Sequence, residues 1–130
     1  MSRPLDAVTG TILVVDDDAA VVTVTQYMLE ALGFRVLTAR DGEQAVTTFR
    51  DRQDVVDLVV LDMVMPRIGG KETFERLREI DPAVPVLLSS GYSPEGHVAQ
   101  VLGQGKSDFL QKPFGIDELS RKVEGLLPTA

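Results

Sequence analysis

The chain has 130 residues, 44% of them hydrophobic and 25% charged, and a formal net charge of -7 at pH 7. These values fit one globular domain with its own core, and the acidic balance argues against a nucleic-acid-binding surface. No apolar run approaches the ~20 residues that cross a bilayer, and we expect a cytoplasmic protein without a membrane anchor. With no cysteine and one histidine, a bound metal would need oxygen ligands, which favours Mg²⁺ or Ca²⁺.

Aliphatic runs predict five short strands, and apolar residues at helical spacing predict helices between and after them. The strands are expected at residues 11–15, 34–38, 57–61, 84–88 and 108–110. Helices are expected at residues 19–32, 71–80, 95–102 and 116–127, and one more follows the capping pair Asp41 and Gln44. The first of them would be capped by Asp18, end at Gly33 and carry an apolar stripe of Val21, Val24, Met28 and Leu32. We interpret residues 1–10 as a flexible leader, 11–127 as the domain and 128–130 as a tail.

Strands that alternate with helices in this way predict an α/β fold with a doubly wound parallel sheet and helices on both faces. The flavodoxin-like strand order 2-1-3-4-5 is the expected arrangement. In that order the first and third strands are neighbours, and a crevice opens at their carboxyl ends, where ligands bind in such sheets.

Polar residues cluster where these strands end. Asp16 and Asp17 follow the first strand, Asp62 the third, Ser90 the fourth and Lys112 the fifth. Three carboxylates brought to one crevice repel each other, and a cation such as Mg²⁺ would relieve that repulsion. An ammonium and a hydroxyl beside them suit phosphoryl oxygens, and the carboxylate of Asp62 can act as a nucleophile.

Four segments give the chain a resemblance to the receiver domains of two-component response regulators, over about residues 10 to 127. They are ILVVDD at 12–17, LDMVMP at 61–66, SSG at 89–91 and FLQKPF at 109–114. The third and fourth segments look like those of receivers attached to hybrid sensor histidine kinases. The resemblance implies a signalling domain that takes a phosphoryl group from the phosphohistidine of a kinase or a histidine phosphotransfer protein.

The same resemblance assigns roles to the acidic residues. It makes Asp62 the phosphoacceptor and a metal ligand, and Asp17 a direct ligand of Mg²⁺. It gives Asp16 a contact to the metal through water and makes the backbone carbonyl of Val64 a further ligand.

Further residues are assigned to the phosphoryl group and the switch. Ser90 and Lys112 would bind the phosphoryl group, and Phe109 would turn inward when Ser90 moves toward it. Val64 and Tyr92 occupy the two positions that tune phosphoryl lifetime in this family, and we expect a long lifetime from them. The switching face, built by the fourth and fifth strands, is also a possible homodimer interface.

An alternative is an Mg²⁺-dependent aspartyl-phosphate phosphatase on a similar fold, which shares the nucleophile. Such enzymes use a second acid two residues after the nucleophile, and Val64 stands there in this chain. A structural receiver-like domain with an inactive site is a third hypothesis, but it would be expected to lack one of the acids or the lysine. We therefore expect a phosphoacceptor rather than an enzyme. Its downstream partner is not encoded in these patterns.

Overall fold

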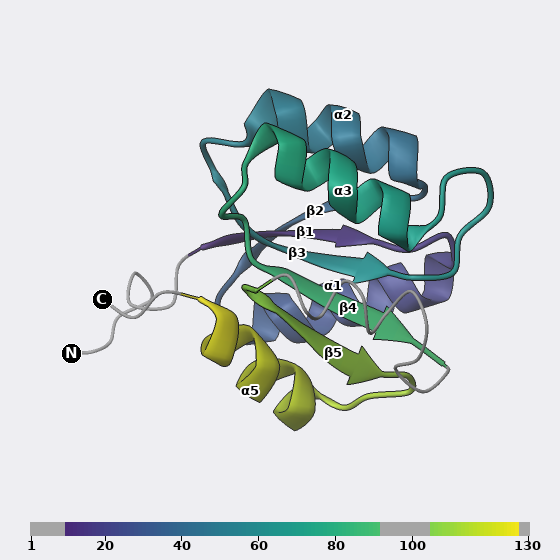
Figure 1. The fold of residues 1–130 in the computed structure, drawn as a ribbon. Coiled ribbons are helices and arrows are strands. Elements are labelled where there is room, and N and C mark those ends of the chain that lie inside the picture. The colour runs from purple at the N-terminus through teal and green to yellow at the C-terminus, as the bar shows by residue number, and fades with distance from the viewer. Residues whose placement is uncertain (1–9, 92–104, 128–130) are drawn as a thin grey trace.

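The computed structural model describes residues 10–91 and 105–127, which form a parallel sheet between two layers of helices (Figure 1). The strand order is β2-β1-β3-β4-β5, which confirms the predicted topology. The elements are β1 (Thr11–Val15), α1 (Ala19–Ala31), β2 (Arg35–Ala39), α2 (Gly42–Arg52), β3 (Val56–Asp62), α3 (Gly70–Ile80), β4 (Val86–Ser90), β5 (Ser107–Gln111) and α5 (Ile116–Leu126).

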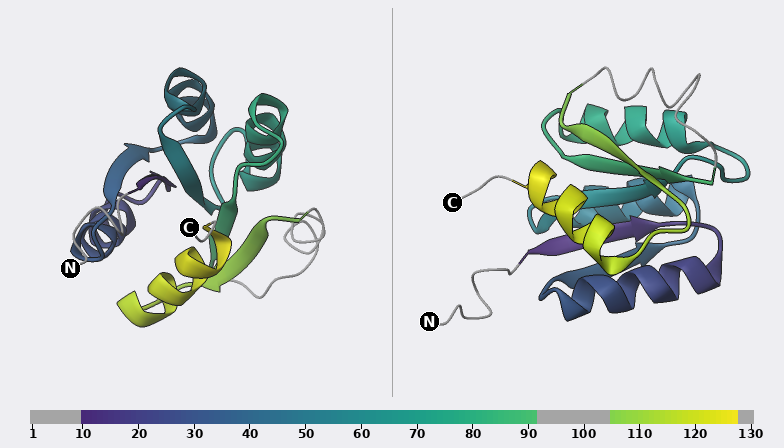
Figure 2. Two further views of the ribbon diagram at one scale, coloured as in Figure 1. Left: turned by 90° about the vertical axis from the view of Figure 1, so that its left-hand side faces the viewer. Right: turned by 90° about the horizontal axis from the view of Figure 1, so that it is seen from below.

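The helix predicted at residues 95–102 lies outside the described residues, as do residues 1–9 of the predicted leader and the predicted tail. Helices α2 and α3 cover one face of the sheet, and α1 and α5 cover the other (Figures 1 and 2). Within the described residues, no helix combines the length and the apolar character needed to cross a membrane.

Each layer of helices buries its own apolar cluster against the sheet, since side chains along a strand point alternately to the two faces. The cluster under α2 and α3 is built around Phe49, Phe74, Leu61 and Leu88. The opposite cluster, under α1 and α5, is built around Ile12, Val60, Leu87, Leu119 and Val123. Strands β1, β3 and β4 contribute to both clusters, as expected for strands buried on both faces.

Local signals set the helix ends much as predicted. The side chain of Asp18 accepts hydrogen bonds from the backbone N–H groups of Ala20 and Val21 and caps α1. Asp41 caps α2 by accepting from the N–H of Gln44 at 2.8 Å. After α1, Gly33 takes a positive φ of 99°, which a residue without a side chain adopts readily.

Two expectations were wrong in register. The fourth strand is Val86–Ser90 and not 84–88, because Val84 belongs to a turn in which its N–H donates to the Asp81 carbonyl, and Pro85 has no N–H for a ladder. On α1, the predicted apolar stripe of Val21, Val24, Met28 and Leu32 is only partly the core face, because Met28 and Leu32 pack against the core while Val24 is exposed. The buried residues are Val22, Thr25 and Leu29.

The strand register brings the predicted site residues together. Val15 pairs with Leu61, so Asp16 and Asp62 are the next residues on neighbouring strands. Asp62 pairs with Ser89 on β4, and Ser90 pairs with Gln111, immediately before Lys112. All four polar positions therefore lie at the carboxyl edge of the sheet, where the arrowheads end in Figure 1.

Candidate functional site

Three carboxylates converge at this edge, from the end of β3 and from the turn after β1. Each of Asp16, Asp17 and Asp62 offers one oxygen atom, and these oxygens all lie within 4.8 Å of one another. Asp16 and Asp62 are buried, with 2% and 3% of their surface exposed, whereas Asp17 is exposed. The group therefore has two shielded carboxylates at its base and one at the solvent boundary.

Lys112 supplies the positive charge of the cluster, from the loop after β5. Its Nζ donates a 2.6 Å hydrogen bond to Oδ2 of Asp16 and lies 3.4 Å from Oδ1 of Asp62. The peptide bond between Lys112 and Pro113 is cis. Lys112 thus bridges the two buried carboxylates, although one ammonium does not balance three carboxylates.

The local electrostatics show the imbalance. Burial and the neighbouring charge of Asp16 raise the pKa of Asp62 from 3.8 to about 6, against the opposing effects of Lys112 and of the Val64 N–H. Burial alone would lower the pKa of Lys112, but its hydrogen bond to Asp16 and the charges of Asp62 and Asp16 together raise it. The site consequently keeps Lys112 charged and holds the Asp62 carboxylate in an environment that disfavours its ionised form.

Backbone N–H groups fix the two buried carboxylates in place. Oδ1 of Asp16 accepts from the N–H of Asp18 at 2.9 Å, and Oδ1 of Asp62 accepts from the N–H of Val64 at 3.2 Å. Each aspartate thus bonds the residue two positions on, which is a common way for Asp to hold a turn. The turns after β1 and β3 are preorganised by the same side chains that form the cluster.

Helix α3 begins directly against the backbone of the site. A Cβ atom on Gly70 would lie 2.5 Å from Cα of Met63 and 2.8 Å from the carbonyl oxygen of Asp62. At Gly69, where the receiver pattern often has Asp, a Cβ atom would meet nothing within 4 Å. The close approach at Gly70 lets the first turn of α3 support the end of β3.

The other predicted site residues have different surroundings. Ser90 is buried at the last position of β4, and Phe109 is partly buried against the cluster under α2 and α3. The Val64 residue is 57% exposed in the loop after β3. Tyr92 lies outside the described residues.

Sequence reasoning missed Arg40, which contacts the site from the turn between β2 and α2. Its guanidinium donates a 2.8 Å hydrogen bond to the backbone carbonyl of Asp17. No pattern in the sequence predicted the contact, because it joins residues 23 positions apart on different loops. Arg67, in the loop after β3, instead pairs with Asp41 at 3.0 Å.

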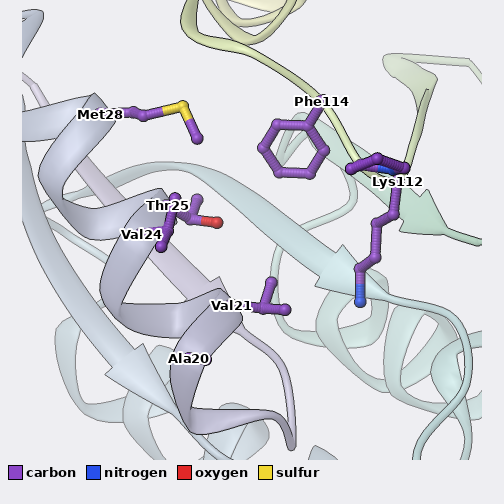
Figure 3. Close-up of a pocket in the computed structure, with 8 residues that line it drawn as sticks. Ala20, Val21, Val24, Thr25, Met28, Lys112 and Phe114 are labelled. Atoms are coloured by element: carbon purple, nitrogen blue, oxygen red, sulfur yellow. The ribbon is translucent and has the colours of Figure 1, made fainter.

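An apolar groove of about 250 Å³ lies next to Lys112 (Figure 3). One wall is α1, which contributes Val21, Val24 and Met28, the residues of the predicted apolar stripe. The other wall is the loop after β5, where Phe114 faces the helix. The stripe therefore lines a surface groove, and one end of that groove reaches the lysine of the acidic site.

Comparison with known proteins agrees with this geometry. The family model for the response regulator receiver domain matches residues 12–124. The chain therefore belongs to the response regulator receiver family. The phosphatase alternative finds no support in these comparisons, and the predicted fold and function class are confirmed.

Individual relatives agree in sequence and in structure. The alkaline phosphatase synthesis transcriptional regulatory protein PhoP of Bacillus subtilis is 36% identical over 116 residues, which cover 89% of this chain and 48% of that protein. A receiver domain protein from Clostridium thermocellum superposes with a TM-score of 0.85 at 26% identity, over 90% of this chain and 93% of that one. The receiver domain of the hybrid histidine kinase CckA superposes with a TM-score of 0.78 at 33% identity, over 92% of this chain and 100% of that one. The chain thus spans about half the length of the first of these relatives.

Proposed function

We propose that this domain accepts a phosphoryl group on Asp62 from the phosphohistidine of a sensor histidine kinase or a histidine phosphotransfer protein, in the cytoplasm. The observation that carries the proposal is the bridging of Asp16 and Asp62 by Lys112 beside a third carboxylate. A buried carboxylate held by one ammonium and one backbone N–H is oriented for attack on phosphorus. The chain's membership of the receiver family makes a regulatory role the natural context.

The same residues suit a divalent cation. The three carboxylate oxygens lie within reach of one ion, and burial together with the charge of Asp16 raises the pKa of Asp62 in spite of Lys112. Hard oxygen donors of this kind fit Mg²⁺, which keeps several of its waters. In our proposal Asp17, Asp62 and the Val64 carbonyl are direct ligands, and Asp16 binds through water. When bound, Mg²⁺ would neutralise charge on the phosphoryl oxygens.

In the transfer step, an oxygen of Asp62 attacks phosphorus while the bond to the imidazole nitrogen of the donor breaks. The electron pair of that bond returns to the ring, and an acyl phosphate forms on Asp62. Lys112 lies close enough to Asp62 to pair with a phosphoryl oxygen, and the hydroxyl of Ser90 is the second proposed contact. Both contacts strengthen as charge develops on the transferred group.

Signalling requires that phosphorylation change a binding face. We propose that Ser90 moves toward the phosphoryl group and that Phe109 then packs more deeply, which remodels the face formed by β4 and β5. That face is also our candidate for homodimer formation. The donor protein would instead approach over α1, where the apolar groove leads to Lys112.

The test is direct. Acetyl phosphate with Mg²⁺ should add one phosphoryl mass to the wild-type protein, detected by intact mass spectrometry and mapped to Asp62 after borohydride reduction. Asp62→Asn should lose the modification, while Asp54→Asn, which changes an exposed acid, should keep it. An Asp62→Asn protein that still gained the same mass at the same rate would refute the assignment.

A further inference from the structure

The turn that carries Asp17 is held by an arginine outside the acidic cluster. Oδ1 of Asp16 accepts the N–H of Asp18, and the guanidinium of Arg40 donates to the carbonyl of Asp17. These two groups belong to the same peptide unit, the one between Asp17 and Asp18. Its N–H and its carbonyl are thus both bound, so that the plane of this peptide cannot rotate without breaking a hydrogen bond.

The orientation of that peptide bears on Asp17. A peptide plane sets one backbone dihedral of each residue that it joins, here ψ of Asp17 and φ of Asp18. Asp18 must keep an extended conformation because it caps α1. Asp17 is exposed, and among the described residues its side chain makes no hydrogen bond or ion pair, so the direction of its carboxylate depends on its backbone.

Arg40 is itself well anchored. Its own N–H donates to Oε1 of Gln44 at 2.6 Å, and Gln44 in turn donates its N–H to Asp41. The preceding residue, Ala39, accepts a 3.2 Å hydrogen bond from the N–H of Asp16. The start of α2 is thereby connected to the turn after β1 through both the backbone and the Arg40 side chain.

We infer that Arg40 is a positioning residue for the cation site, acting through the Asp17–Asp18 peptide. The inference rests on the proposed function, because it takes Asp17 as a metal ligand. Groups that hold a metal ligand in place typically change metal affinity by about tenfold or more when removed. Arg40 holds the backbone of the ligand and not its carboxylate, so we expect a smaller loss, about three- to tenfold.

The positive charge of Arg40 allows two explanations to be separated by whether its removal tightens or weakens Mg²⁺ binding. Arg40 is a cation next to an acidic cluster, and its removal should by electrostatics alone tighten the binding of Mg²⁺. A loss of orientation should weaken binding instead. Arg40→Met removes both the charge and the donor, so the direction of the change in affinity separates the two effects.

The experiment is a titration of the 130-residue protein with Mg²⁺, in which binding is monitored by backbone amide NMR. Arg40→Met should bind Mg²⁺ about three- to tenfold more weakly than wild type, and Arg40→Lys, which keeps a charged donor, should recover part of the loss. Without Mg²⁺, the Asp18 amide signal of Arg40→Met should shift, because its peptide unit has lost one partner. Arg67→Met, which removes an exposed arginine from the loop after β3, should bind within about twofold of wild type.

Two outcomes overturn the inference and are distinguishable. If Arg40→Met binds Mg²⁺ as tightly as wild type or tighter, while Asp17→Asn loses binding, Arg40 does not position the ligand and the proposed cation site stands. If Asp17→Asn binds as well as wild type, the cation site of the proposed function fails, and the inference fails with it. Equal unfolding free energies of Arg40→Met and wild type without Mg²⁺ would separate a positioning effect from a general loss of stability.

Discussion

The two edges of the sheet differ in how their partly buried charged groups are paired. At the amino edge, the guanidinium of Arg78 donates to the carbonyls of Val84, Gly105 and Lys106 at 2.9, 2.9 and 3.0 Å, and lies 4.6 Å above the Phe74 ring. At the carboxyl edge, one ammonium faces three carboxylates.

The difference separates a charge that stabilises the fold from a group of charges that we propose to be functional. The Arg78 charge is met by carbonyl dipoles that need a donor, which ties the end of α3 to the residues just before β4 and β5. The acidic cluster places three carboxylates around one ammonium, and burial together with the charge of Asp16 raises the pKa of Asp62. Such an unmet charge costs stability and leaves the site ready to bind a cation. Four variants test this contrast.

The largest effect is expected at the amino edge. Arg78→Met should lower the free energy of unfolding by about 3–4 kcal/mol, because three carbonyls lose a charged donor. Among the described residues, Arg76 on the same helix pairs only with Glu72, at a largely solvated position, and Arg76→Met should cost less than about 0.5 kcal/mol. Urea denaturation would measure both. Equal costs for the two arginines would show that the carbonyl contacts of Arg78 add no stability.

At the carboxyl edge, a change that disturbs the backbone should lower stability more than a change that removes a charge. Gly70→Ala would push a methyl group into the backbone of Met63 and Asp62, with an expected cost of about 2–3 kcal/mol and slower phosphorylation by acetyl phosphate. Gly69→Ala, with open space around its Cβ, is the matched control and should be nearly neutral. If both variants fold and react like wild type, the close contact of α3 does not support the site.

Removing the charge of Asp62 should raise the free energy of unfolding, whereas the two changes above should lower it. The pKa of Asp62 in the folded state is raised to about 6, so between about pH 4 and 6 the native state binds more protons than the unfolded state. The free energy of unfolding therefore falls as pH rises through this window, and above it ionised Asp62 costs about 2–3 kcal/mol. Asp62→Asn should thus stabilise the Mg²⁺-free protein by about 2 kcal/mol at pH 7.5.

The pH dependence is the sharper part of that prediction. Most of the gain from Asp62→Asn should disappear at pH 4.5, where the native carboxyl is already protonated. Asp54→Asn, at an exposed position, should change stability by little at either pH. Urea denaturation of the wild type and both variants at pH 4.5 and 7.5 measures these differences in the free energy of unfolding. A stabilisation by Asp62→Asn that is equal at both values would mean that the charge of Asp62 is not its source.

The carboxyl edge was largely predictable because strand ends are visible in sequence. The aliphatic runs before Asp16 and Asp62 indicate buried parallel strands, and such strands must end at one edge. The first half of the α1 stripe was assigned to the wrong face because Val21 and Val22 are adjacent, so that two apolar stripes fit helical spacing. Only packing shows that Val22 enters the core while Val21 lines the groove.

The long-range contacts of Arg40 at the carboxyl edge and of Arg78 at the amino edge were not predictable. Arg40 to Asp17 and Arg78 to Gly105 join residues 23 and 27 positions apart, through single hydrogen bonds to backbone carbonyls. A carbonyl acceptor leaves no trace in the sequence, since every residue has one. The carboxyl group of Asp62 was recognisable by its place in a motif, whereas its raised pKa depends on the burial and spacing that only the fold supplies.

The smallest expected effect is on the lifetime of the acyl phosphate on Asp62. Hydrolysis of the acyl phosphate needs a water aligned with phosphorus, and the Val64 side chain offers that water no hydrogen bond. Its backbone N–H already binds Asp62, and its residue is 57% exposed, so a polar side chain could be placed there without a core penalty. Val64→Asn combined with Tyr92→Glu should shorten the lifetime about tenfold, the rate equivalent of about 1.4 kcal/mol.

The lifetime is measured by following loss of the phosphoryl mass from Asp62 after removal of acetyl phosphate, with Mg²⁺ in excess. Val64→Asn alone shows how much of the effect comes from the described loop. Val55→Asn replaces an exposed valine at the amino edge and should leave the lifetime unchanged. If the double variant loses phosphate no faster than wild type, access of water to phosphorus is set elsewhere.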